Sequence, residues 1–168
     1  TEYTFTLRDD VRFHDGTPVT AHDVVFTVQT AQNPEIKSTH RIDWEGVTVS
    51  ATDDRTVHFK LPRAYAPFIY NTTLGILPKK HWENVTPEEF PFNPLNTHPI
   101  GSGPYMVEDF LTDETGAATR YDLIPAPSFP LGGPFLKRVT LLFYPNESEL
   151  IKAFNAGRIG SLSGISPS

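Results

Sequence analysis

Two histidine–aspartate pairs are the first residues in the chain whose chemistry could be functional. His14 precedes Asp15, and His22 precedes Asp23. Such pairs could bind a metal or exchange a proton. One pair is expected in a turn and the other on a helix, however, and the spacing of the two histidines matches no standard set of metal ligands. Asp15 is well placed to close the turn on its own backbone, and Asp23 to sit at a helix start. We therefore predict structural roles for both aspartates.

The other histidines give no stronger indication of a metal centre. The six histidines are scattered singly, and neither His-x-x-x-His nor His-Glu-x-x-His occurs. A zinc enzyme needs three convergent ligands, which this pattern does not supply. The chain also has no cysteine, so a disulfide framework, a thiolate zinc site and a cysteine nucleophile are excluded. We expect no metal ligands and no cofactor.

The segment Gly101-Ser102-Gly103-Pro104 resembles two catalytic loops without matching either. A phosphate-binding loop requires Lys-Ser/Thr and a following helix, and a nucleophile elbow requires Gly-x-Ser-x-Gly turning into a helix. Here a proline and a predicted strand follow instead, so we predict no catalytic residue. The glycines would allow a tight crossing between two parts of the chain. Because ligand cavities favour such crossings, the candidate cleft-edge residues are Gly101, Ser102, Gly103 and Tyr105.

Several aromatic side chains in the first half could stack on a ligand. At this density, however, aromatic residues are more typical of core packing. We therefore predict that they pack within the fold: Trp44, Trp82, Tyr65, Phe68 and Tyr70.

Composition narrows the class of protein. The chain has 168 residues and a net charge of −6, which argues against nucleic acid or an anionic membrane surface as the main partner. No run of about 18 apolar residues occurs, so we expect no segment that spans a bilayer. The first residues carry neither a basic stretch nor an apolar one, so we expect no signal peptide within these residues.

Alternating and helical patterns predict a mixed α/β or α+β fold. A strand is expected at 3–8, and a helix from Thr20 to the stop signal Asn33-Pro34, with Asp23 in a capping-box position. A hairpin is expected next at 47–61. A helical turn is expected at 65–70, with the side chains of Phe68 and Ile69 pointing inward. The second part should contain strands at 105–111, 120–124 and 138–144, a helix at 147–156 and a short strand at 159–165. The strand at 138–144 is the most apolar and is expected in the centre of its sheet.

Four motifs, in this order, resemble the bacterial extracellular solute-binding proteins of family 5, the dipeptide-, oligopeptide- and nickel-binding components of ABC importers. They are FTLR at 5–8 with VRFHDGTPVTAHDVVF at 11–26, LPKKHW at 77–82, PIGSGPY at 99–105, and RVTLLFY at 138–144 with FNAGRI at 154–159. Two details depart from the family pattern. Gly160 stands where an acidic residue is usual, and 123–134 lacks an Asn-x-x-Tyr pattern.

The resemblance implies a type II periplasmic-binding-protein-like fold with two lobes that close on a ligand. It places residues 1–99 in an extra subdomain of the first lobe and residues 100–168 in part of the main first-lobe sheet. The second lobe would be absent from this chain. In the family, that lobe and the hinge supply much of the ligand contact, including an acidic residue that meets the amino end of a peptide.

The function implied is capture of an extracytoplasmic solute, foremost a peptide, for delivery to a membrane ABC permease, without catalysis. The location implied is periplasmic or extracellular and membrane-anchored. A nickel chelate, a sugar or an opine remains open as the ligand. We expect residues 1–168 alone to lack useful ligand affinity.

Two alternatives remain open. One is a free-standing hydrolase or metal-dependent enzyme, which would need a convergent Ser102–His or His–Asp site. The other is a protein-interaction module that binds a partner through an apolar surface at the 138–144 sheet edge.

Overall fold

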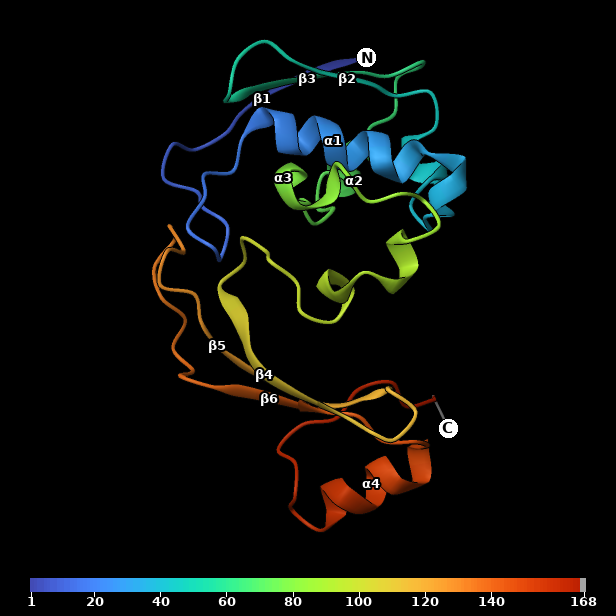
Figure 1. Ribbon diagram of the computed structural model, residues 1–168, viewed down its shortest axis with the longest axis vertical. Helices are drawn as coiled ribbons and strands as arrows, with labels where there is room; N and C mark the ends of the chain where they lie inside the picture. The colour runs from blue at the N-terminus through green and yellow to red at the C-terminus, as the bar shows by residue number, and fades with distance from the viewer. Residues whose placement is uncertain (167–168) are drawn as a thin grey trace. The chain divides into compact units, whose positions relative to one another are not determined.

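A computed structural model describes residues 1–166 and shows a mixed α/β fold, which confirms the predicted class (Figure 1). The chain divides into two compact units, Thr1–Met106 with Pro125–Lys137, and Val107–Ile124 with Arg138–Ser168. The strands of the first unit are β1 (Glu2–Thr6), β2 (Thr48–Ala51) and β3 (Thr56–Lys60). Its helices are α1 (Ala21–Gln32), α2 (Phe68–Asn71) and α3 (Lys79–Trp82). It also contains four 3-10 turns, at Pro34–Ile36, Ile42–Trp44, Phe90–Phe92 and Pro94–Asn96. Strands β4 (Tyr105–Thr112) and β5 (Ala118–Pro125) each cross the boundary between the units, and β6 (Val139–Leu142) and α4 (Glu147–Asn155) lie in the second unit.

The sheet of the first unit is antiparallel, with β3 between β1 and β2. Tyr3 lies opposite Phe59 and Phe5 opposite Val57, so the alternating apolar residues of both strands share one face. Val57 and Phe59 are buried there, whereas the intervening residues are not. The predicted strand at 3–8 and the predicted hairpin are therefore confirmed.

Helix α1 runs along this apolar face in Figure 1. It begins directly after Thr20 and ends before Asn33, as the capping and proline signals predict. The residues that it buries lie on one side, because at about 3.6 residues per turn they span less than half of the helix circumference: Ala21, Asp23, Thr27, Val28 and Ala31.

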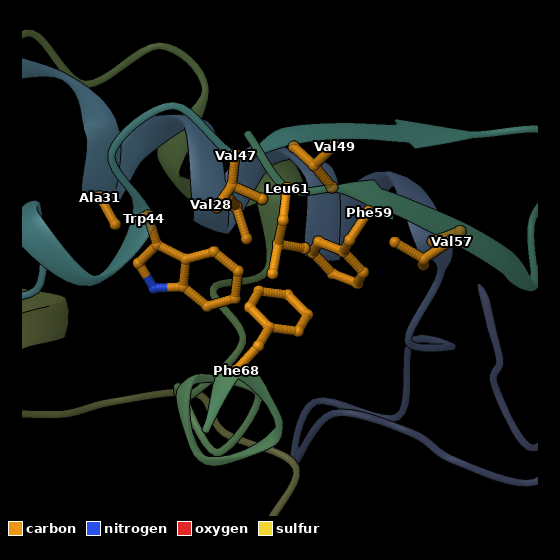
Figure 2. Close-up of a cluster of buried hydrophobic side chains, with 10 residues drawn as sticks. Val28, Ala31, Trp44, Val47, Val49, Val57, Phe59, Leu61 and Phe68 are labelled. Atoms are coloured by element: carbon orange, nitrogen blue, oxygen red, sulfur yellow. The ribbon is translucent and has the colours of Figure 1, made fainter. Parts of the chain in front are cut away.

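The core lies between the sheet, α1 and α2, and aromatic rings fill its centre (Figure 2). The Phe68 ring centroid lies 5.4 Å from that of Phe59 and 5.7 Å from that of Trp44. Phe68, Trp44 and Trp82 are buried, which confirms the core prediction for them. The prediction is wrong for Tyr65, Ile69 and Tyr70, which are exposed. The four-residue helix α2 turns one face to the core and buries Phe68, and Tyr65 lies before this helix.

The other sheet has the order β4-β5-β6, with β5 and β6 antiparallel. The predicted central position of the 138–144 strand is wrong, because β6 lies at an edge of the sheet within the described residues. Leu141 and Leu142 stay more than 40% exposed. An apolar run indicates a surface suited to burial, but it does not say which segment covers that surface.

The segments around α4 confirm one local prediction and correct another. The Asn146 side chain caps α4 by accepting from the Glu149 N–H at 3.0 Å, and Gly157 takes φ +69° just after the helix. The predicted strand at 159–165 is wrong, since residues 161–166 adopt no regular structure. Gly164 is in the left-handed region at φ +78°, which interrupts an extended strand.

An open groove of about 1010 Å³, with both polar and apolar walls, lies between β6, α4 and residues 158–164. Its walls include Leu141, Phe143 and Leu150. Among residues 1–166, no helix is long and apolar enough to cross a membrane.

Candidate functional site

The turn at residues 12–18 is built from its own backbone. Phe13 is buried and donates its N–H to the Thr17 carbonyl at 2.8 Å, and Gly16 completes the reversal at φ +84°. One Asp15 carboxylate oxygen accepts from the Thr17 N–H at 3.0 Å and from the Thr17 hydroxyl at 2.6 Å. The predicted structural role of Asp15 in this turn is confirmed.

The second carboxylate oxygen of Asp15 ties the turn to α3. It accepts from His81 Nε2 at 2.9 Å and from Lys80 Nζ at 3.2 Å. Burial raises the pKa of the Asp15 carboxyl, but the hydrogen bonds from His81, Thr17 and Lys80 outweigh burial and hold that pKa well below its usual range. Asp15 is therefore a charged anchor between the turn and α3.

Replacing Asp15 with asparagine is expected to remove a pH-dependent part of the stability. An unfolded aspartate has a pKa of about 3.9, and the folded value is lower, so this contribution is complete above the unfolded pKa and is lost as the pH falls through the folded one. The free energy of unfolding of the wild type should exceed that of Asp15→Asn by about 1–2 kcal/mol at neutral pH, and the gap should narrow in acid. Denaturant unfolding at a series of pH values measures this gap.

Thr17→Val, which removes one of these hydrogen bonds, should give a smaller gap with the same pH trend. A gap between the wild type and Asp15→Asn that stays constant from neutral pH into acid contradicts the assignment.

Asp23 joins the start of α1 to the start of α3. One carboxylate oxygen accepts from the Thr20 N–H and hydroxyl, both at 2.8 Å, and the other accepts from the Lys79 N–H at 2.8 Å. One turn further along α1, the Thr27 hydroxyl accepts from the Leu77 N–H at 2.9 Å. The predicted helix-start role of Asp23 is confirmed, and its bond to the LPKKHW motif was not foreseen.

His14 holds the glycine loop at 101–103, and all of these residues belong to the first unit. The His14 N–H donates to the Gly101 carbonyl at 2.7 Å, and the Gly101 N–H donates to His14 Nδ1 at 3.2 Å. His14 Nε2 lies 3.1 Å from the Gly103 carbonyl. The partners lie 87 and 89 residues apart in sequence, so no local pattern around His14 could have identified them.

Of the predicted cleft-edge residues, the structure brings Gly101 and Gly103 to His14, and it gives Tyr105 a separate partner. The Tyr105 hydroxyl donates to the Leu136 carbonyl at 3.1 Å. Ser102 is half-buried, and within the described part of the chain its hydroxyl has no hydrogen-bond partner. The role of these four residues at a ligand cleft stays a prediction.

The geometry around Ser102 lacks the arrangement of a hydrolase. Both ring nitrogens of His14 are engaged by the glycine backbone, and Asp15 binds His81 rather than His14. A triad needs a histidine bonded to the nucleophile on one side and to a carboxylate on the other. Across residues 1–166, no three His, Cys, Asp or Glu side chains gather as metal ligands would.

The second unit contains a buried carboxylate that no pattern in the sequence indicates. Asp122 on β5 accepts from the Thr140 hydroxyl at 2.6 Å, and it pairs with Arg120 and Arg138. The Thr140 and Arg120 bonds hold the pKa of the Asp122 carboxyl below its usual range. Arg138 also pairs with Glu108 on β4, so the cluster joins all three strands and its charges balance.

Comparison with known proteins gives one consistent result. The family model for bacterial extracellular solute-binding proteins, family 5 Middle, matches residues 1–168. Protein XP55 of Streptomyces lividans is 42% identical over 106 residues, which is 62% of this chain and 19% of that protein.

Solved structures agree with the sequence match. The oligopeptide-binding protein AppA from Bacillus subtilis, in complex with a nonapeptide, matches with a TM-score of 0.77 and 31% identity, over 94% of this chain and 31% of that one. NikZ from Campylobacter jejuni, in complex with Ni(L-His), matches with a TM-score of 0.79 and 28% identity, over 94% of this chain and 31% of that one.

This chain thus spans less than a third of the length of each of these three proteins. The match nevertheless covers every residue of the chain, including all four motifs. The chain belongs to the bacterial extracellular solute-binding proteins of family 5.

Proposed function

We propose that the protein carrying this chain captures a peptide outside the cytoplasm and passes it to a membrane ABC permease without altering it chemically. The observation that carries this proposal is the match, at a TM-score of 0.77, to a relative solved with a nonapeptide. The protein would act in the periplasm, or outside the cell and anchored to a membrane.

The internal geometry supports a binding role rather than catalysis. The motif residues with the most reactive side chains, His14, Asp15 and Asp23, are all engaged in hydrogen bonds that hold segments together. Ser102 lacks a histidine with a free ring nitrogen beside it. These engagements favour a rigid wall for a ligand over an acid–base or nucleophilic site.

We further propose that residues 1–99 form the extra subdomain of the first lobe and that 100–168 contribute to its main sheet. In this arrangement Gly101, Ser102, Gly103 and Tyr105 lie at the cleft edge. Closure of the lobes would be driven by the higher ligand affinity of the closed state. Because this chain would supply only one wall, residues 1–168 alone should not bind with useful affinity.

The test uses the natural polypeptide that contains residues 1–168. It is incubated with a randomised nonapeptide library and, separately, with the nickel–histidine chelate, and the retained molecules are identified by mass spectrometry. We expect retention of nonapeptides at one per protein. Retention of the nickel chelate alone would contradict the peptide assignment, and retention of neither would contradict both ligand classes.

The exposed apolar side chains in the groove beside β6 favour a second candidate, an interaction module. These side chains, Leu141 and Phe143 among them, form a surface suited to a protein partner. A concentration-dependent dimer that uses the β6 edge would support this candidate.

A further inference from the structure

The His14 ring packs against the glycine loop closely enough to explain one of its glycines. A Cβ atom at Gly101 would lie 3.3 Å from His14 Cε1, whereas a Cβ at Gly103 would meet no atom within 4 Å. Neither glycine has a left-handed φ. Glycine at position 101 is therefore explained by the approach of the ring, and glycine at position 103 is not.

The two ring hydrogen bonds define one protonation form of His14. The Gly101 N–H can only donate, so Nδ1 must accept. The Gly103 carbonyl can only accept, so Nε2 must carry the proton. In a neutral ring protonated on Nδ1, the ring N–H would face the Gly101 N–H, and the unprotonated Nε2 would face the Gly103 carbonyl oxygen. Both hydrogen bonds would be lost.

The turn that carries the His14 ring is itself held in place. Phe13 is 1% exposed, and Asp15 ties the turn to α3 through His81 and Lys80. The ring thus reaches the loop from a buried and charge-anchored turn rather than from a free segment. A substitution of the His14 side chain should remove the two ring hydrogen bonds without unfolding the turn, and it leaves the backbone hydrogen bond to the Gly101 carbonyl in place.

Ser102 lies between the two glycines that the ring holds. Within residues 1–166 its amide N–H and its hydroxyl have no hydrogen-bond partner, and the residue is half-buried. Two unengaged donors on a loop held at both sides suit an oxygen atom of a ligand, such as a peptide carbonyl or carboxylate.

We propose that His14, as its Nε2-protonated tautomer, is a positioning residue that holds the Gly101–Gly103 loop so that Ser102 offers its donors to a carbonyl or carboxylate oxygen of the ligand. This inference rests on the proposed function for the ligand, whereas the hold on the loop stands on the geometry alone. The two parts can therefore be tested separately.

The first experiment records long-range ¹H–¹⁵N spectra of the histidine rings in the natural polypeptide, at mildly alkaline pH and without ligand. We expect a single His14 signal with the proton on Nε2, and slow hydrogen exchange at the Gly101 amide that becomes fast in His14→Phe. A proton on Nδ1, or an unchanged exchange rate in His14→Phe, would overturn the hold on the loop.

The second experiment measures affinity for a nonapeptide retained from the library. His14→Phe keeps an aromatic ring at this position but removes both nitrogens, and it should weaken binding about tenfold. His14→Asn, whose side-chain oxygen can accept from the Gly101 N–H, should recover part of the loss. Gly101→Ala should weaken binding, while the matched control Gly75→Ala should not, since the added methyl at Gly75 meets no atom within 4 Å.

Wild-type affinity in His14→Phe would overturn the positioning role. If the wild-type protein retains neither the nonapeptides nor the nickel–histidine chelate, the proposed function fails, and the donor role of Ser102 fails with it. The ring spectrum still decides the hold on the loop in that case, so the two failures are distinguishable.

Discussion

Replacing Phe68 with alanine is expected to lower the free energy of unfolding of the first unit by about 3–5 kcal/mol. The Phe68 side chain is 1% exposed and its ring contacts those of Tyr3, Trp44 and Phe59. Truncation removes apolar burial and leaves a cavity at the point where the sheet and α2 meet. Hydrogen exchange of the β3 amides in the natural polypeptide measures the loss.

The next residue along the chain supplies the matched control. Ile69 is 48% exposed, so Ile69→Ala should change the same exchange rates by less than about 1 kcal/mol. Equal effects of Phe68→Ala and Ile69→Ala would contradict the aromatic core shown in Figure 2.

Replacing Asp23 with alanine is expected to cost about 3 kcal/mol, because it leaves the Thr20 and Lys79 N–H groups without their acceptor. Asp23 is 8% exposed, so water cannot readily replace the carboxylate. The loss should appear as faster hydrogen exchange at the amides of α1 and α3 together, since one side chain holds both helix starts.

Asp9→Ala is the matched control for this substitution. Its side chain is 79% exposed and forms one ion pair of 3.7 Å with Arg55, so the expected change is below about 1 kcal/mol. Faster exchange at α1 alone in Asp23→Ala would show that the contact with Lys79 carries no stability.

Local signals in the sequence predicted the local structure well. The capping box at Thr20 and Asp23, the Asp-Gly turn after His14 and the asparagine cap of α4 each depend on residues within four positions of one another. Alternation in β1 and β3 predicted which face of the first sheet is buried, because the side-chain period of a strand is fixed by its geometry.

Features that depend on distant partners could not be predicted from the residues alone. The bonds of His14 to Gly101 and of Asp23 to Lys79 join segments that are 87 and 56 residues apart. The edge position of β6 was missed for the same reason, because apolarity does not identify the segment that covers a strand. The motif resemblance identified the family, and the structure assigns packing roles to several of the motif residues.

The proposed function is capture of a peptide without chemical change. The most direct measurement loads the natural polypeptide with a nonapeptide retained from the library, removes unbound peptide, releases the bound molecules by denaturation and weighs them. We expect one intact nonapeptide for each protein molecule, with its mass unaltered after prolonged incubation. Shortened peptides would contradict capture without chemistry, and the absence of bound peptide would contradict capture itself.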